Sequence, residues 1–245
     1  FGQTYLKIEK KIGETDSIAL SNIQRIYFSS YSNGLVAFYP FEGSVEDASG
    51  NNNDGTVYGG VTYTTDRFNN SNQAIHLDGV SGYIKVPNSS SLQSPVNSIT
   101  LAGWIYVESF PSLQIAGILN KTDDPNYGQY NLSYQSWSTP SIVFTLGSSG
   151  AGLSANSQLN LSQWYFLTAV YDGASQKVYL NGSLVSSNTV SITISPDEKP
   201  LTIGIETPGE TEYFTGKLDD LRIYNVALNA AEIQALYHEG GWTGR

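Results

Sequence analysis

Two neighbouring carboxylates lie inside an apolar run near the C-terminal end of the chain. Residues 218–224 read LDDLRIY, which is typical of a β-strand. Strict alternation along such a strand places Asp219 on the same face as Leu221. A carboxylate on a core-facing side must meet a cation, because burying it alone costs several kcal/mol. Asp219 is therefore a candidate metal ligand, and the alternative is a bond to Lys217, to Arg222 or to a backbone N–H.

A second stretch, residues 123–137, combines aromatic rings with amide and carboxylate side chains and reads DDPNYGQYNLSYQSW. Sugar recognition commonly uses aromatic faces together with hydrogen bonds from Asn, Asp and Gln. We expect a carbohydrate site here, with Tyr127, Tyr130, Tyr134 and Trp137 as ligand-binding residues. The alternative is that Tyr130 and Tyr134 alternate into the core of a strand while the remaining residues stabilise a loop.

The same residues offer no recognisable hydrolytic arrangement. Glycosidases need two carboxyl groups that face each other across the scissile bond. Asp123 and Asp124 are adjacent and would point to opposite faces of a strand, and the acids at 210 and 212 follow Pro208 in an expected loop. Cysteine is absent and there are two histidines, so a thiolate nucleophile is excluded. The sequence predicts no catalytic residues and a protein that is not an enzyme.

The elements that would position these residues are short strands separated by turns. Apolar or alternating runs predict strands at 34–41, 74–79, 82–87, 99–107, 164–171, 177–180, 183–185, 200–205 and 214–224. Asn181-Gly182 between two of them is the signal of a type I′ hairpin. Trp104 and Trp164 lie in expected central strands and are assigned to the core. Asn229 and Glu232 predict one short C-terminal helix with a capping box.

Composition supports an all-β chain and excludes several classes of partner. The sequence has 24 glycines, 17 tyrosines and a formal net charge of −10. Such a charge argues against nucleic acid and anionic membranes as partners. No apolar run reaches the ~20 residues that a membrane-spanning helix needs, so we expect no membrane insertion. Two stacked antiparallel sheets with one short helix account for this pattern.

Residues 1–33 differ from the rest of the chain and form a candidate N-terminal arm. Apolar and charged residues alternate at its start, as in a half-exposed strand. A segment of ~30 residues cannot bury a core alone. We therefore expect a strand-forming arm over 1–33 and one domain over 34–245. Such an arm could add to the sheet edge of a neighbouring copy.

The order of the motifs carries a family resemblance. The matching runs are LVAFYPFEG at 35–43, DASGN at 47–51, TTDRFN at 64–69, LDG at 77–79, SITLAGW at 98–104, QWYF at 163–166, YDG at 171–173, VYLNG at 178–182 and residues 216–233. Together they resemble the laminin-G-like branch of the concanavalin A-like lectin/glucanase superfamily. The resemblance implies a jelly-roll sandwich of one concave and one convex sheet, and it leaves the arm outside.

The resemblance also implies one structural calcium ion where the first and last strands meet. Carried over by position, its ligands would be Asp219, the carbonyl of Gly79, and either Glu42 or the carbonyl of Pro40. Calcium takes six to eight oxygen ligands, and mixed carboxylate and carbonyl sets suit it.

A further oxygen-rich segment lies at residues 42–55. Asp47, Ser49, Asn51 and Asn53 occupy alternate positions there, as in a weak form of a calcium loop. The alternative is a turn-rich loop in which these side chains accept bonds from their own backbone.

These observations favour a secreted or cell-surface module that binds a polysaccharide or glycoprotein without catalysis and holds a structural Ca²⁺. The first alternative is a structural subunit of an extracellular filament or surface assembly, which would use residues 1–33 for strand addition. A glycan-active hydrolase is the third class, and it would need a carboxylate pair about 5–10 Å apart in the concave groove.

Overall fold

The computed structural model describes residues 33–110, 115–122, 128–136, 140–147, 151–156, 159–206 and 212–244. The chain divides into a short unit, Phe1–Ser30, and a large unit, Tyr31–Arg245. All described residues belong to the large unit. The arm expected over 1–33 lies outside the described residues apart from Asn33. Its role in strand addition therefore stays a prediction.

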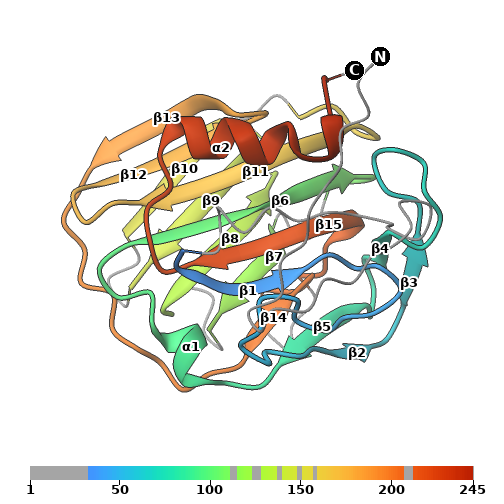
Figure 1. The fold of residues 1–245 in the computed structure, drawn as a ribbon, viewed down its shortest axis with the longest axis horizontal. Coiled ribbons are helices and arrows are strands. Elements are labelled where there is room, and N and C mark those ends of the chain that lie inside the picture. The colour runs from blue at the N-terminus through green and yellow to red at the C-terminus, as the bar shows by residue number, and fades with distance from the viewer. Residues whose placement is uncertain are drawn as a thin grey trace, which may run out of the picture. The chain divides into compact units, whose positions relative to one another are not determined.

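The large unit is a sandwich of two antiparallel sheets, which confirms the all-β prediction (Figure 1). Sheet A has eight strands, in the order β13 (Ser183–Thr189), β12 (Ser175–Leu180), β11 (Trp164–Tyr171), β6 (Ile99–Val107), β15 (Thr215–Tyr224), β4 (Ala74–Asp78) and β3 (Val61–Thr64), with β1 (Leu35–Tyr39) paired to β15. Sheet B has seven strands, in the order β10 (Ala151–Asn156), β9 (Ser141–Leu146), β8 (Tyr130–Gln135), β7 (Ile115–Lys121), β14 (Leu201–Ile203), β5 (Tyr83–Val86) and β2 (Thr56–Tyr58).

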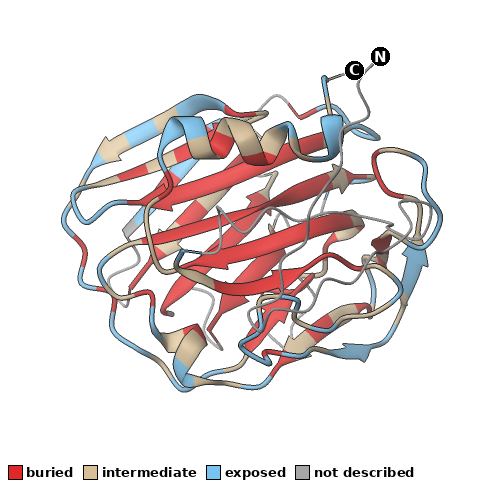
Figure 2. Cartoon of the chain, in the orientation of Figure 1, coloured by how far each residue is buried: buried red, intermediate tan, exposed pale blue. Residues whose placement is uncertain are grey.

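The main core lies between the two sheets, where alternate residues of each strand point inward. In β8, Tyr130, Leu132 and Tyr134 belong to this core, which leaves Asn131 and Ser133 on the outer face of sheet B. Figure 2 shows the buried residues concentrated along the central strands, with exposed residues at the edges.

A second, smaller core covers the outer face of sheet A. Helix α2 (Ala230–Tyr237) supplies Ile233 and Leu236, and these pack in one cluster with Trp104, Phe166 and Tyr224 of the sheet. Both faces of β6 and β11 are therefore covered, which explains why their sequences are apolar at nearly every position. No range was predicted for strands β2, β3, β7, β9 and β10, nor for the short helix α1 (Ser90–Gln93) and a 3₁₀ turn, Glu239–Gly241.

The predicted hairpin turn at Asn181-Gly182 and the predicted capping box of helix α2 are both confirmed. Asn181 and Gly182 adopt φ angles of 50° and 75° between β12 and β13, as a type I′ turn requires. The side chain of Asn229 accepts from the N–H groups of Ala231 and Glu232, and the Glu232 carboxylate accepts from the Asn229 N–H.

Replacing Asn229 with alanine is expected to lower the free energy of unfolding by about 1 kcal/mol, because two N–H groups of α2 lose their acceptor. Urea unfolding at an unchanged m-value would measure the loss. Asn156→Ala, at an exposed position of β10, is the matched control. Equal losses in both variants would contradict the capping role.

Candidate functional site

A β-bulge in β15 decides where Asp219 points. Between Asp219 and Arg222, β15 has one residue more than the facing stretch of β6, and Asp220 adopts a φ of 51°. Leu218 and Leu221 both lie in the core between the sheets. Asp219, next to Leu218, therefore lies on the outer face of sheet A. The prediction that Asp219 shares a face with Leu221 is wrong, because the extra residue breaks the two-residue period.

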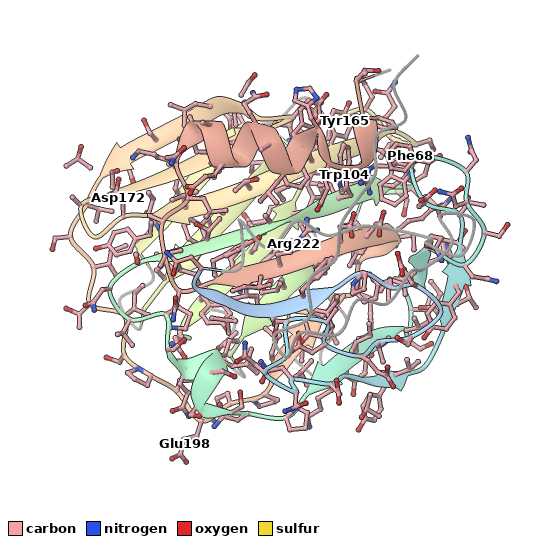
Figure 3. All side chains as sticks on the ribbon, viewed as in Figure 1. Phe68, Trp104, Tyr165, Asp172, Glu198 and Arg222 are labelled. Atoms are coloured by element: carbon pink, nitrogen blue, oxygen red, sulfur yellow. The ribbon has the colours of Figure 1, made fainter. Side chains whose placement is uncertain are left out.

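The cation that meets Asp219 is Arg67. One guanidinium nitrogen of Arg67 lies 2.8 Å from the Asp219 carboxylate and 2.9 Å from that of Asp220, and all three side chains are fully buried. The same guanidinium lies 4.6 Å from the centre of the Phe68 ring and 4.5 Å from that of the Trp104 ring. Figure 3 labels these two aromatic residues, Phe68 and Trp104. A paired carboxylate at Asp219 was predicted from the sequence, but Arg67 was not among the partners considered.

The loop that carries Arg67 is held by the carboxylate of Asp66. This group accepts hydrogen bonds from the N–H groups of Phe68 and Asn70, at 2.8 Å each. The turn projects Arg67 inward over Trp104. Arg67 stands in a run, TTDRFN, that carries the family resemblance, and this was the available sign of its importance.

Of the residues expected to bind calcium with Asp219, Gly79 lies well away from it along the sheet. Asp78, which precedes Gly79, pairs with Thr215, four residues before Asp219. Gly79 is therefore about 13 Å away along the strand. Pro40 and Glu42 follow β1, whose last residue Tyr39 pairs with Leu221, so the same register continued runs toward Asp219. Among the described residues, no group of three His, Cys, Asp or Glu side chains could hold a metal. Asp219 is paired with Arg67, and calcium binding with Asp219, Glu42, Gly79 and Pro40 stays a prediction.

The oxygen-rich loop at 42–55 is a turn that binds its own backbone. The Asp47 carboxylate accepts hydrogen bonds from the N–H groups of Phe38, Ser49 and Asn53 at 2.9–3.0 Å. The Asn53 amide donates to the carbonyl of Val36 at 2.8 Å. These bonds confirm the turn interpretation of this segment over the calcium-loop interpretation.

The aromatic stretch at 123–137 is only partly described. Tyr130 and Tyr134 are fully buried, and the Tyr130 hydroxyl donates to the carbonyl of Leu92 at 3.1 Å. These two rings belong to the core, as the alternative held, and they offer no face to a sugar. Tyr127 and Trp137 lie outside the described residues, so their ligand-binding role stays a prediction.

An open groove instead lies on the outer face of sheet A, beside the Arg67 loop. Its volume is about 460 Å³. Tyr106, Trp164 and Lys217 line it from three adjacent strands, and Asn69 and Trp242 line it from the flanking segments. We call it the Trp164 groove.

Strand register brings the groove's side chains together. Tyr106 of β6 pairs directly with Trp164 of β11 on one side and with Lys217 of β15 on the other. The rings of Tyr106 and Trp164 are 5.4 Å apart at 59°, and the ammonium of Lys217 lies 4.7 Å from the Tyr106 ring centre. Directly opposed residues share a face, so these three groups must converge.

Polar side chains complete the groove around these rings. Gln163 is exposed, and its carbonyl oxygen accepts from the Tyr165 hydroxyl at 2.9 Å and from the Asn160 amide at 3.4 Å. An aromatic ring beside amide groups and a cation suits a polyhydroxylated ligand, which needs one apolar contact and several hydrogen bonds. These groups suit the binding of a ligand.

The sequence analysis missed this groove because it assigned Trp164 to the core. Trp104 is fully buried, whereas Trp164 is only partly buried: it packs against the cluster under α2 and keeps part of its ring exposed. Trp164 is the first residue of β11, and it lies where the cover of helix α2 over the sheet ends. The polar residues Ser162 and Gln163 just before it were the available signal.

The sequence of most of this sandwich matches a known family. The model of the concanavalin A-like lectin/glucanases superfamily matches residues 78–234. The chain belongs to this superfamily. A search of curated protein sequences finds no match.

Solved structures of similar fold are found in two kinds of protein. Domain 4 of AbnA, an extracellular GH43 arabinanase from Geobacillus stearothermophilus solved with arabinotriose, is 22% identical with a TM-score of 0.64, covering 83% of this chain and 98% of that one. The binding domain of Paraclostridial Mosquitocidal Protein 1 is 21% identical with a TM-score of 0.69, covering 84% and 52%.

The receptor-binding domain of botulinum neurotoxin C/D mosaic serotype is 17% identical with a TM-score of 0.68, covering 84% of this chain and 51% of that one. This chain thus spans about half the length of both toxin structures. At these identities the likeness shows a shared fold. None of the helices in the described residues is long and apolar enough to cross a membrane.

Proposed function

We propose that this chain is a non-catalytic module that binds a glycan, free or on a glycoprotein, in the Trp164 groove. The observation that carries the proposal is the convergence of Tyr106, Trp164 and Lys217 from three paired strands into one open groove. An aromatic ring with an exposed face gives apolar contact at a low cost in conformational entropy, and the neighbouring amides can bond hydroxyl groups.

The similar structures support the ligand class. The arabinanase domain was solved with arabinotriose, and cell entry of botulinum neurotoxin type C depends on two ganglioside molecules. The binding domain of botulinum neurotoxin DC was solved with rat synaptotagmin II, a protein. Sugars and a protein are thus both ligands of this fold, which favours a glycan or a glycoprotein partner.

The net charge of the chain limits which class of glycan it would bind. The net charge of −10 disfavours strongly anionic polymers, so a neutral polysaccharide is the better ligand. The acid that lines the groove, Asp66, is held by backbone N–H groups of its own loop and acts there as a structural group. A secreted or cell-surface location fits such a ligand, and the arabinanase of similar fold is extracellular.

Replacing Trp164 with alanine is expected to weaken glycan binding roughly 30-fold, the effect of losing about 2 kcal/mol of contact. A glycan array would first identify the ligand, and isothermal titration calorimetry would then give the dissociation constants of both proteins. Gln163→Ala, at an exposed position of the groove, is expected to weaken binding severalfold without disturbing the fold.

Tyr58→Ala is the matched control, because Tyr58 is an exposed aromatic residue of sheet B. It should bind like the wild type. Undiminished affinity in both Trp164→Ala and Gln163→Ala would reject the groove as the binding site. Unfolding curves of each variant would separate lost binding from lost structure.

A further inference from the structure

Two asparagines lie side by side on the outer face of sheet B, away from the Trp164 groove. Asn120 of β7 and Asn131 of β8 are directly paired, so their side chains share a face. The Asn131 amide donates to the Glu206 carboxylate at 2.8 Å, and the Asn120 amide donates to the Ile205 carbonyl at 2.9 Å. Both side chains therefore use their NH₂ groups in bonds to residues 205–206. Their side-chain carbonyl oxygens remain available to accept another bond.

A second carboxylate reaches the same place by strand pairing. Ile205 and Tyr213 form an antiparallel bridge, so the next pair in this register is Glu206 with Glu212. The carbonyl of Glu212 also accepts from the N–H of Gly117 in β7, at 3.1 Å. Like charges that face each other across a strand pair destabilise it, unless something neutralises them.

The backbone of residues 205–206 packs closely against β7 at Gly117. A side chain at Gly117 would collide with the Glu206 backbone nitrogen, which would lie 2.2 Å from its Cβ. Glycine at this position therefore lets residues 205–206 lie directly on β7. The site is a built feature of the fold.

The buried side-chain atoms of Glu206, Asn120 and Asn131 that lack a hydrogen-bond partner are all oxygen acceptors. Glu206, Asn120 and Asn131 are 3%, 0% and 6% exposed, and each has a buried side-chain oxygen without a hydrogen-bond partner. Burial and the charge of Glu212 raise the pKa of Glu206 to about 7, against the hydrogen bond from Asn131. A buried polar oxygen without a hydrogen bond costs free energy, and three such oxygens at one place point to a bound cation.

We propose that Glu206, Glu212, Asn120 and Asn131 bind a calcium ion on the outer face of sheet B. Carboxylate and amide oxygens are ligands that calcium prefers, and water can complete the six to eight positions. Neither cysteine nor histidine belongs to this group, which disfavours metals that prefer sulfur or nitrogen. The ion would join β7 and β8 to Glu206 and Glu212, which flank the Ile205–Tyr213 bridge. This site lies on the other sheet from the Trp164 groove, so each proposal can fail independently.

The test is a titration of the metal-free protein with CaCl₂ by isothermal titration calorimetry, together with thermal unfolding in CaCl₂ and in EDTA. We expect one binding event and a rise of the melting temperature by roughly 5 °C at saturation. Glu206→Gln keeps the size of the side chain and should weaken calcium binding at least ~10-fold. In EDTA this variant should be at least as stable as the wild type, which would show that it folds.

Glu198→Gln removes the same charge at an exposed position and is the matched control, with unchanged binding expected. No calcium response in the wild type, or an equal response in Glu206→Gln, would overturn the proposal. Tighter binding of MgCl₂ than of CaCl₂ would overturn the choice of metal. Release of sugar from a polysaccharide that Glu206→Gln abolishes would assign the two carboxyl groups to hydrolysis instead.

Discussion

The Arg67→Met variant is expected to lose about 3–5 kcal/mol of unfolding free energy, because it removes the guanidinium that pairs with two buried carboxylates. Asp219 and Asp220 are fully buried and share one guanidinium nitrogen of Arg67. The same group lies over the ring of Trp104, so its loss also removes a cation–π contact from the layer under helix α2. The cost exceeds the worth of the ion pair itself, since two charges stay buried with one cationic partner fewer.

Chemical denaturation would measure this loss, and two companion variants make it specific. Arg67→Met combined with Asp219→Asn and Asp220→Asn removes these two buried charges and should recover a large part of the stability. Lys177→Met breaks a partly exposed pair with Asp172, 2.6 Å long, and should cost at most about 1 kcal/mol. A loss in Arg67→Met no larger than in Lys177→Met would contradict a buried network that holds the fold.

The second large effect is a fall in the stability of the calcium-free protein as the pH rises from about 4.5 to about 7. Burial and the charge of Glu212 raise the pKa of Glu206 from 4.5 to about 7 in the folded state, against the hydrogen bond from Asn131. The folded state then binds more protons than the unfolded state in this range, so stability decreases with pH. A shift of this size corresponds to about 3 kcal/mol.

Unfolding free energies in EDTA at several pH values would test this fall, with Glu206→Gln beside the wild type. The variant has no titrating group at this position, so its curve should be flatter over the same interval. Asp78 behaves in the opposite way, since N–H groups of Ser81, Val80 and Gly82 outweigh its burial and lower its pKa to about 2. Its contribution is lost only in stronger acid. Parallel curves for wild type and Glu206→Gln would refute the assignment.

Features set by neighbouring residues were predictable from the sequence. The capping box at Asn229 and the type I′ turn at Asn181-Gly182 depend on a few adjacent residues, and both are confirmed. The two-sheet sandwich also followed, because alternation and the order of motifs across residues 34–242 reflect which faces are buried. The core alternative for Tyr130 and Tyr134 came from the same alternation.

The candidate sites were much less predictable, because they depend on register between distant strands. Trp164, Tyr106 and Lys217 are far apart in sequence and meet only through the pairing of β11, β6 and β15. Glu206 and Asn131 are likewise far apart in sequence. Their hydrogen bond joins two different parts of sheet B, and no local sequence motif predicts it. Side-chain types alone predicted a sugar-binding site at residues 123–137, but two of the four residues named for it, Tyr130 and Tyr134, are buried in the core.

The amino-acid sequence by itself determined the fold class, the helix cap, the hairpin and the need for a cation near Asp219. Only the tertiary structure decided which cation that is. One extra residue in β15 turned Asp219 to the outer face, and the Asp66 turn brought Arg67 to it from 152 residues away in the chain. A bulge and a long-range contact leave little local signal, since they depend on how one strand is paired with another and on what covers the sheet.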